Sequence, residues 1–208
     1  MKVLVFGAAG RTGRNIVDQA LNRGYQVTAV IHKTRGIEKD VEKGLQAVQG
    51  DVLNFGDVER AVAGHDAVLS ALGRGSSRRQ VTFPGTKNIV EAMEKLGVRR
   101  LIVESAFGAG ESAKEMSFLD RFLVRGVLLR SSFRDKDMME GYVEKSGLEW
   151  TIVRPPRLTD GPRRGRYRAG ERIPLNIRSG MSREDAADFK LEQVEGKEFI
   201  NKKPSVGY

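Results

Sequence analysis

The 208-residue chain contains no cysteine, only two histidines and no long apolar run. The absence of cysteine excludes disulfides, thiolate metal sites and a cysteine nucleophile, and it is typical of a cytoplasmic protein. His32 and His65 alone are too few for a histidine metal cluster or a histidine-based triad, so we expect no metal site. The chain has no run of about 18 apolar residues, so we expect no membrane span and no membrane partner. The sequence begins directly with an apolar strand, so we expect no signal peptide.

Basic residues outnumber acidic ones, 36 to 27, which gives a formal net charge of +9. A basic surface attracts either nucleic acid or a phosphorylated cofactor with an anionic substrate. The basic residues concentrate in four separate stretches, at 74–79, 99–100, 121–134 and 163–168, rather than in one tract. No helix-turn-helix or zinc-finger spacing accompanies them. We therefore favour a phosphorylated cofactor over nucleic acid.

Length and composition fit one globular domain over residues 1–208. Short apolar runs alternate with helical patterns along most of the chain. Strands are expected at 2–6, 26–31, 45–48, 67–72, 100–103 and 150–153, with helices after the first strand and at 58–63, 83–96, 117–129, 133–145 and 182–194. This alternation predicts an α/β fold, a Rossmann-type doubly wound parallel sheet. Segment 108–117 is expected to be a loop of small residues, and 198–201 a short final strand. Segment 157–170, rich in Arg, Gly and Pro, is expected to cover the site, and a small C-terminal lobe from about 157 to 208 to complete the substrate pocket.

A glycine-rich turn, GAAGRTG, connects the first expected strand to the first expected helix. This is the context of a dinucleotide fingerprint, although the spacing is GxxGxxG rather than GxGxxG. Gly7 permits the tight turn, Gly10 lets the backbone approach a pyrophosphate, and Gly13 lets helix and strand pack closely. The helix N-terminus offers free N–H groups to the phosphates. A turn without a ligand is the alternative, and the position of the motif favours a cofactor.

The residues after the second expected strand bear on the choice of cofactor. NAD-binding proteins usually place an acid there to hold the ribose 2′-hydroxyl. Here His32, Lys33 and Arg35 occupy the place, and such cations pair with a 2′-phosphate. A solvated basic loop is the alternative. We therefore predict that the cofactor is NADP(H) in preference to NAD(H), with Asp51, after the third strand, near the adenine.

Several segments together resemble a known family: GAAGRTG, GDVLNFGDVERAVAGHDAV, GTKNIVEAME, SAF and SGLEWTIVRPP. The chain is similar to the NmrA-like NAD(P)-binding proteins among the atypical short-chain dehydrogenase/reductases, and within them to the biliverdin-IXβ reductase or NADPH-flavin reductase group. The similarity runs from Met1 to about Tyr167 and is weaker beyond. It implies an NADPH-binding oxidoreductase. The cofactor-binding residues expected from the motif and the resemblance are Gly7, Ala9, Gly10, Arg11, Thr12, Gly13, His32, Lys33, Arg35, Asp51, Val52, Leu72, Gly73, Arg74, Ser105, Ala106, Phe107, Pro155 and Pro156.

The chain departs from this family at two catalytic positions. The family dyad is YxxxK; Lys136 fits the lysine, but Ser132 stands where the tyrosine belongs, and Tyr142 lies too far along. Arg157 occupies the place of a histidine that the biliverdin-IXβ reductase group carries after its proline pair. Arginine stays charged at any working pH, so it is a poor acid and a good anchor for an anion.

The catalytic candidates are Ser105, Lys136 and Arg157. Ser105 would hydrogen-bond the nicotinamide amide or a substrate oxygen, Lys136 would lie near the ribose, and Arg157 would orient an anionic group. The alternatives are a strand-end cap, a solvated helix lysine and a solvated loop arginine, respectively. The aromatic residues Phe107, Phe118 and Phe122 are expected in the core or the pocket wall.

The leading hypothesis is a cytoplasmic NADPH-dependent reductase that acts as a monomer or a small homo-oligomer. Its partner would be a small-molecule electron acceptor, anionic and conjugated, such as a flavin, a quinone or a linear tetrapyrrole. The alternative is a non-catalytic redox sensor that binds NADP(H) and acts through a protein partner. Nucleic-acid binding rests on charge alone.

Overall fold

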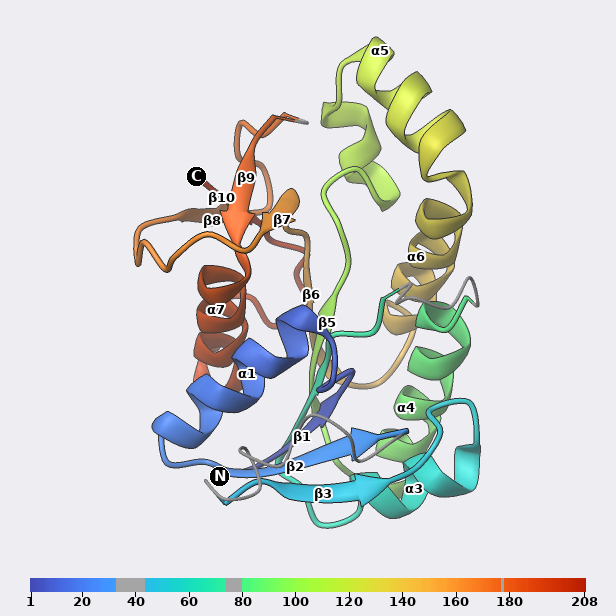
Figure 1. The fold of residues 1–208 in the computed structure, drawn as a ribbon. Coiled ribbons are helices and arrows are strands. Elements are labelled where there is room, and N and C mark those ends of the chain that lie inside the picture. Colours follow the sequence, from blue (N-terminus) through green and yellow to red (C-terminus); the bar gives the residue numbers. More distant parts are fainter. Residues whose placement is uncertain (33–43, 74–79, 177) are drawn as a thin grey trace.

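The computed structural model describes residues 1–32, 44–73, 80–176 and 178–208. In this part of the chain the main sheet has six parallel strands in the order β3-β2-β1-β4-β5-β6 (Figure 1). The strands are β1 (Lys2–Phe6), β2 (Gln26–Ile31), β3 (Gln46–Gln49), β4 (Ala67–Ser70), β5 (Arg100–Glu104) and β6 (Glu149–Val153). The strand order reverses between β1 and β4, which is the position where doubly wound sheets bind ligands. The predicted Rossmann-type fold is confirmed.

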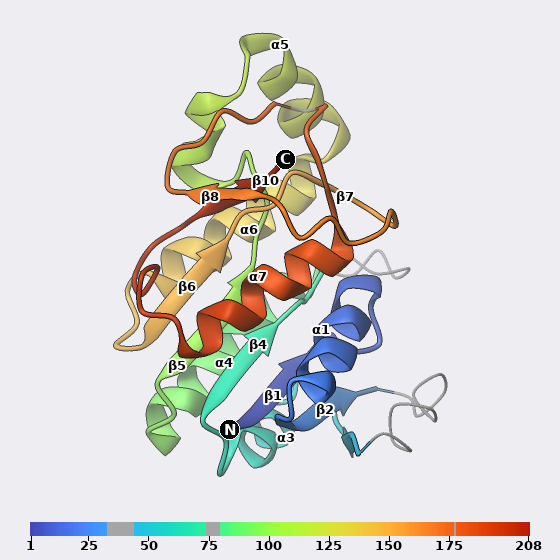
Figure 2. The same cartoon turned by 90° about the vertical axis from the view of Figure 1, so that its left-hand side faces the viewer.

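Helices cover both faces of this sheet. On one face lie α1 (Arg11–Asn22) and α7 (Arg183–Glu195), side by side in Figures 1 and 2. On the other lie α3 (Phe55–Val62), α4 (Thr82–Leu96) and α6 (Arg130–Val143). Alternate residues of β1 serve the two layers: Val3 and Val5 pack with α1 and α7, whereas Leu4 and Phe6 pack with the other helices. Both faces of the strand are therefore apolar, as the sequence run predicts.

The C-terminal part forms two small sheets beyond the main one. β7 (Arg157–Thr159) pairs in parallel with β9 (Gly180–Ser182), and β8 (Arg168–Gly170) pairs antiparallel with β10 (Ser205–Gly207). The last residues also follow the edge of β6, where the Arg154 N–H donates to the Pro204 carbonyl at 2.9 Å. The lobe that the sequence predicts from about residue 157 thus includes α7, which covers the main sheet beside α1.

Three expectations about local structure are wrong. The predicted final strand at 198–201 is a turn in which Asn201 takes a left-handed conformation, with φ of 56°, and the last strand is β10. The predicted loop at 108–117 contains a 3₁₀ helix, η1 (Gly110–Glu115). The predicted helix at 117–129 is a short α5 (Phe118–Asp120) followed by a π-helix, η2 (Arg121–Leu128). Its wider turn is visible where the Leu129 N–H donates to the carbonyl of Val124, five residues back, at 2.8 Å.

Several boundaries also shift. α3 begins at Phe55 rather than 58, because the Asn54 side chain caps it by accepting from the N–H groups of Gly56 and Asp57. β3 ends at Gln49 and β4 at Ser70, rather than at 48 and 72. None of the helices in the described ranges is long and apolar enough to cross a membrane.

Candidate cofactor-binding and active site

The glycine turn after β1 closes tightly around its own backbone. Gly7 has φ of +79°, and a Cβ there would lie 2.6 Å from the Ala71 carbonyl oxygen. A Cβ on Gly13 would lie 2.1 Å from the Gly7 carbonyl oxygen, so helix and strand can approach only without one. Gly10 differs, because its Cβ would meet only the Gly7 oxygen, at 3.1 Å. The first and third glycines are therefore required by packing, and the backbone of the second faces open space.

The N-terminus of α1 presents its positive end beside this open glycine. Gly10 is the N-cap, and neither a capping side chain nor an acidic residue occupies the first turn. The first N–H groups of a helix have no partner within the helix. Because Gly10 leaves space above them, these groups form a cradle that fits a pyrophosphate. The exposed Arg11 begins the helix and pairs with Asp160 at 3.0 Å.

A cavity of about 200 Å³ lies beside the cradle at the carboxyl ends of β1, β2 and β4. It is lined by Phe6, Gly7, Ala9, Gly10, Val30, Ile31, His32, Gly50, Asp51, Val52 and Leu72. Seven of these are predicted cofactor-binding residues: Gly7, Ala9, Gly10, His32, Asp51, Val52 and Leu72. Sequence reasoning missed the apolar walls from Val30 and Ile31, because strand residues of this kind are equally expected in the core. The walls are suited to the flat, apolar faces of an adenine.

Asp51 has a structural task in addition to any contact with a ligand. One of its carboxylate oxygens accepts from the Leu53 N–H at 2.9 Å, and its own N–H donates to Asp57 at 3.0 Å. These bonds fix the turn after β3. The next residue, Val52, is held through its carbonyl, which accepts from the Asn88 side chain at 2.9 Å. The Asp51–Val52 wall of the cavity is thus held in place by α3 and α4.

Ser105 follows β5, farther along the same edge of the sheet. It is 2% exposed, and its hydroxyl has no hydrogen-bond partner among the described residues. Its N–H donates to the Val153 carbonyl at 2.8 Å, and its carbonyl accepts from the Lys136 ammonium at 2.8 Å. A buried hydroxyl without a partner is uncommon in a folded protein and calls for an explanation. A ligand group at this strand end, such as the nicotinamide amide, would supply the missing partner.

The SAF and RPP segments come together as the resemblance implies. The Phe107 N–H donates to the Pro155 carbonyl at 2.8 Å, so the chains that follow β5 and β6 stay paired. Phe107 is buried, whereas Phe118 and Phe122 are 76% and 59% exposed, so their predicted place in the core or pocket wall is wrong. The exposed pair lies on α5 and η2.

Lys136 reaches the site from α6. Burial lowers the pKa of its ammonium, and the negative charges of Glu104 and Glu140 oppose that shift. Glu104 is itself paired with the buried Lys190 of α7. The two lysines thus approach the end of β5 from opposite faces of the sheet. Tyr142, the other candidate for the dyad, is occupied elsewhere, because its hydroxyl bonds Glu91 at 3.1 Å.

Arg157 begins β7 and is exposed. Its guanidinium makes no hydrogen bond or ion pair with any residue in the described ranges. The predicted residues Lys33, Arg35 and Arg74 lie outside those ranges.

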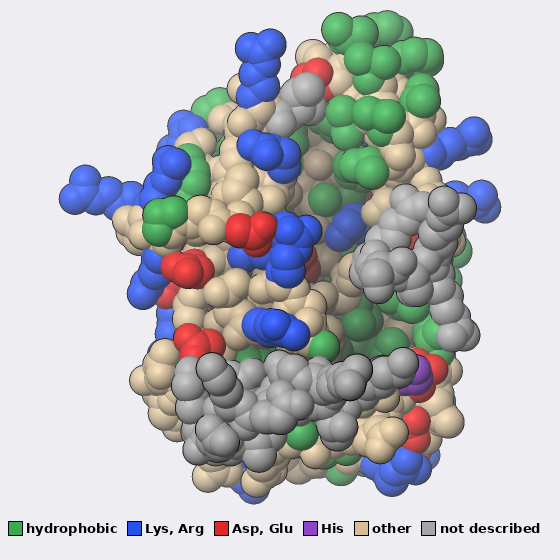
Figure 3. Space-filling view, viewed as in Figure 1, with side chains coloured by type: hydrophobic (Ala, Val, Ile, Leu, Met, Phe, Trp, Pro, Cys, Tyr) green, Lys and Arg blue, Asp and Glu red, His purple; other side chains and the backbone are tan. Residues whose placement is uncertain are grey.

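The space-filling view in Figure 3 shows a hollow in the molecular surface near the centre of the face that is drawn.

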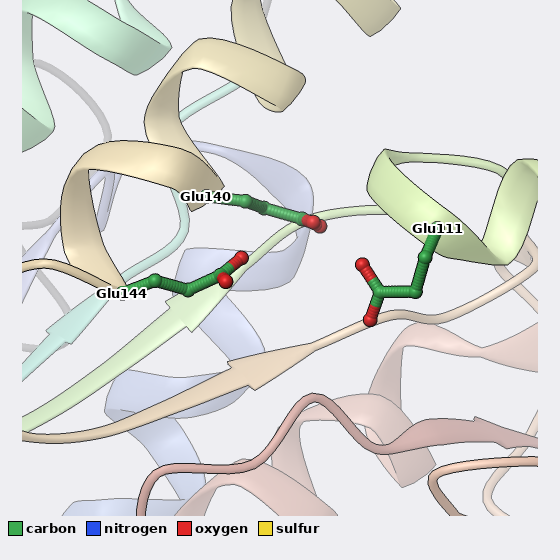
Figure 4. A group of neighbouring side chains, drawn as sticks. All are labelled: Glu111, Glu140 and Glu144. Carbon is green, nitrogen blue, oxygen red and sulfur yellow. The ribbon is translucent and has the colours of Figure 1, made fainter.

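Three glutamates come together beside the carboxyl end of β6: Glu111, Glu140 and Glu144 (Figure 4). Their carboxylate oxygens lie within 4.8 Å of one another, a spacing that would suit a cation. Arg154, however, is 1% exposed and pairs with Glu140 at 2.5 Å and Glu111 at 2.9 Å. Lys203 pairs with Glu111 and Glu144. We therefore interpret the cluster as an ion-pair network that ties η1, α6 and the C-terminal segment to β6.

This network perturbs the titration of its members. Burial would raise the pKa of Glu111, but hydrogen bonds from Arg154 and Lys203 outweigh it and lower the pKa to about 2. Burial would lower the pKa of Arg154, but its hydrogen bonds to Glu140 and Glu111 and the charges of these two glutamates outweigh that effect and raise the pKa. Sequence reasoning missed the network, and the only signal was the spacing of Glu140 and Glu144 by one turn of a helix.

A comparison with protein-family models identifies the class. A family described as NAD(P)H-binding matches residues 7–197. The chain therefore belongs to this NAD(P)H-binding family, and the predicted relation to NAD(P)-binding oxidoreductases of the NmrA-like, atypical short-chain type is confirmed.

Three relatives with known sequences share between 25% and 34% of their aligned residues with this chain. The uncharacterized chloroplastic protein At2g34460 of Arabidopsis thaliana is 34% identical over 79% of this chain and 61% of its own length. YMR090W of Saccharomyces cerevisiae is 27% identical over 93% of this chain and 87% of its own. The photosystem II assembly factor Ycf39 of Synechocystis is 25% identical over 94% of this chain, but this chain spans only 59% of it.

Solved structures support the fold. ChuY, an anaerobilin reductase from Escherichia coli O157:H7, is similar with a TM-score of 0.85 at 23% identity, over 99% of this chain and 96% of that one. A short-chain dehydrogenase/reductase from Veillonella parvula in complex with NADP has a TM-score of 0.85 at 20% identity, over 100% and 94%. At such identities the likeness concerns the fold alone.

Proposed function

We propose that this protein is an NADPH-dependent reductase that passes a hydride to a conjugated small-molecule acceptor such as a flavin, a quinone or a linear tetrapyrrole. The observation that carries the proposal is the unpartnered hydroxyl of Ser105 on the same sheet edge as the open Gly10 cradle. A cofactor that spans the edge from the cradle would bring its nicotinamide to that hydroxyl. The reductase activity in the name of ChuY agrees with this function.

The first half of the chain would hold the cofactor. The N-terminus of α1 and Gly10 would receive the pyrophosphate, and the cavity between β2 and β4 the adenosine. His32, at the end of β2, is exposed beside this cavity, and with Lys33 and Arg35 it would meet a 2′-phosphate. We infer from these cations that NADPH is preferred over NADH. When bound, NADPH supplies the hydride.

The second half would arrange the acceptor. Ser105 would orient the nicotinamide amide or an acceptor oxygen, and Lys136 would hold the strand end through its bond to the Ser105 carbonyl. Arg157, free of protein partners in the described ranges, would anchor an anionic group of the acceptor. Residues 157–208 would close the pocket as a lobe of one domain. A conjugated acceptor can take its proton from solvent, which suits a site with Ser132 in place of the dyad tyrosine.

A second candidate is a non-catalytic sensor that binds NADP(H) and acts on a protein partner. It is favoured by the missing tyrosine and by the engagement of Tyr142 with Glu91, which together leave no tyrosine donor near Ser105. Ycf39, a relative, is named as an assembly factor. The two candidates share the cofactor site and differ in turnover.

Ser105→Ala tests the proposal against a matched control. Ser205 is also buried with an unpartnered hydroxyl, and it lies in β10 beside Arg154. Neither substitution removes a hydrogen bond within the described protein, so both variants should fold. We expect Ser105→Ala to weaken NADPH binding or lower kcat by about two- to tenfold, the effect of one neutral hydrogen bond, and Ser205→Ala to change neither. The readouts are calorimetric titration with NADPH and the rate of NADPH oxidation with flavin mononucleotide, a soluble quinone and biliverdin.

Two results would count against the proposal. If Ser105→Ala and Ser205→Ala behave alike, the Ser105 hydroxyl takes no part in the site. Tight NADPH binding without oxidation by any of the three acceptors would favour the sensor.

A further inference from the structure

An exposed apolar surface covers α5, η2 and the residue that follows them. Of the eleven large hydrophobic residues exposed in the described ranges, seven lie here: Phe118, Leu119, Phe122, Leu123, Val127, Leu128 and Leu129. We call these seven the apolar ridge. Scattered exposed hydrophobic residues are normal, but a concentration of this size on one short segment marks an interaction site.

The apolar ridge protrudes from one corner of the molecule. In Figure 1, α5 stands at the top of the view, and in Figure 3 hydrophobic side chains gather over the same corner. Its outline is not smooth, because a hollow beside it is lined by Val127, Leu128, Arg130 and Arg134. Apolar and basic side chains thus share one open surface.

The segment formed by α5 and η2 is fixed to the rest of the protein through Arg125, so the exposure of its apolar side chains is part of the fold. Arg125 donates to the Gly108 carbonyl at 2.6 Å and pairs with Asp137 of α6 at 2.6 Å. Its guanidinium also lies 5.7 Å from the centre of the Phe133 ring. These contacts use the one partly buried arginine of η2 and leave the phenylalanines and leucines facing outward.

The charges around the apolar ridge point to an anionic partner. Arg121, Arg130 and Arg134 are exposed in or just after it, and Asp120 is the only acidic residue from 117 to 134. A second copy of this chain would bring the arginines of both copies into one interface, because a twofold interface brings the same patch together. With a net charge of +9 on each chain, such a pair repels.

We propose that the apolar ridge docks this protein onto the surface of a bilayer that contains anionic lipid. The phenylalanines and leucines enter the boundary between headgroups and acyl chains, and the arginines pair with lipid phosphates, as in an interfacial amphipathic segment. The ridge lies in the interface, and none of the helices in the described ranges could cross the bilayer. This partner departs from the sequence-based expectation of no membrane partner, which rested on the lack of a long apolar run. The proposal does not depend on the reductase activity.

Co-sedimentation with vesicles tests the proposal on the full chain. One set of vesicles is pure phosphatidylcholine, and the other is an equal mixture of phosphatidylcholine and phosphatidylglycerol. We expect binding to the mixed vesicles, weak binding to the pure ones, and loss of binding as salt is raised. Phe118→Ser with Phe122→Ser should reduce the partition coefficient at least about tenfold. Leu96→Ser is the matched apolar control. Leu96 is an exposed residue at the C-terminal end of α4, outside the apolar ridge, so this substitution should leave binding unchanged.

A second pair of variants separates charge from apolar contact. Arg121→Glu with Arg130→Glu should abolish the preference for mixed vesicles, and Lys145→Glu with Lys197→Glu, at exposed sites elsewhere, should lower binding only slightly. NADPH titration of each variant checks the fold. The proposal is overturned if the wild type ignores the mixed vesicles or if the phenylalanine variant binds them as the wild type does. It is also overturned if the wild type instead forms a dimer that the phenylalanine variant dissociates.

Discussion

Gly10→Val separates a cofactor cradle from an ordinary turn. A Cβ at Gly10 lies 3.1 Å from the Gly7 carbonyl oxygen and meets no other atom within 4 Å beyond its chain neighbours. The valine side chain therefore stands in the open space above the N-terminus of α1, where the pyrophosphate would lie. Equivalent changes at Gly7 or Gly13 would strike the backbone at 2.6 Å or 2.1 Å and unfold the turn. Gly10 is thus the glycine of the three whose substitution disturbs the turn least, since its single contact requires a shift of only a few tenths of an ångström.

The expected loss follows from the contacts that the valine prevents. Two charge-assisted hydrogen bonds from the α1 N-terminus, at about 1.5–3 kcal/mol each, correspond to a rise in Kd of at least about a hundredfold. Calorimetric titration with NADPH measures the Kd, and thermal unfolding followed by circular dichroism shows whether the fold persists. Gly141→Val is the control, because a Cβ on Gly141 of α6 meets nothing within 4 Å and Gly141 lies outside the cradle. A folded Gly10→Val protein with a Kd within about threefold of the wild type would refute the reasoning.

Three further predictions concern charge. Changing Lys33 and Arg35 to Ala should weaken NADPH binding roughly ten- to hundredfold and leave NADH unchanged; equal wild-type affinities for the two cofactors would contradict the predicted preference. Arg157→Ala should raise KM for flavin mononucleotide by about ten- to hundredfold with a smaller fall in kcat, and a large kcat loss at constant KM would assign Arg157 to the transition state instead. The depressed pKa of Glu111 stabilises the fold above its ordinary pKa of 4.5, and this contribution disappears as the pH falls toward about 2. Denaturant titrations should therefore show Glu111→Gln destabilised at neutral pH and less sensitive to acid over that interval, and parallel pH profiles would show that the carboxylate contributes nothing.

The Rossmann-type part of the fold could be predicted from the sequence because the sequence signals for its strands and turns are local. β1 is a continuous apolar run, and Gly7, Gly10 and Gly13 have spacing with a direct steric meaning. The structure assigns separate tasks to these glycines, two for packing and one for open space. The sequence pattern also indicated which loops gather at the carboxyl edge, since parallel strands all end there.

The errors arise where tertiary contacts override local pattern. Phe118 and Phe122 are apolar residues of the kind expected in a core, but Phe118 lies on α5 and Phe122 on the π-helix η2, and both side chains are exposed. The turn at 198–201 is apolar enough for a strand, yet Asn201 reverses the chain and β10 forms farther along. The pairing of Arg154 with Glu111 spans 43 residues in sequence, and no local pattern predicts it.

In the proposed function, hydride passes from NADPH to an acceptor at the Ser105 end of the sheet. The most direct measurement is a single-turnover reaction of the NADPH-loaded protein with flavin mononucleotide, run with ordinary NADPH and with NADPH deuterated at the transferred nicotinamide C4 position. We expect oxidation of the bound cofactor that slows with deuterium and disappears in the Gly10→Val protein. If the deuterated cofactor reacts at the same rate, hydride transfer does not limit the observed step. If the bound NADPH remains unoxidised with flavin, quinone and tetrapyrrole alike, the protein is not the reductase proposed above.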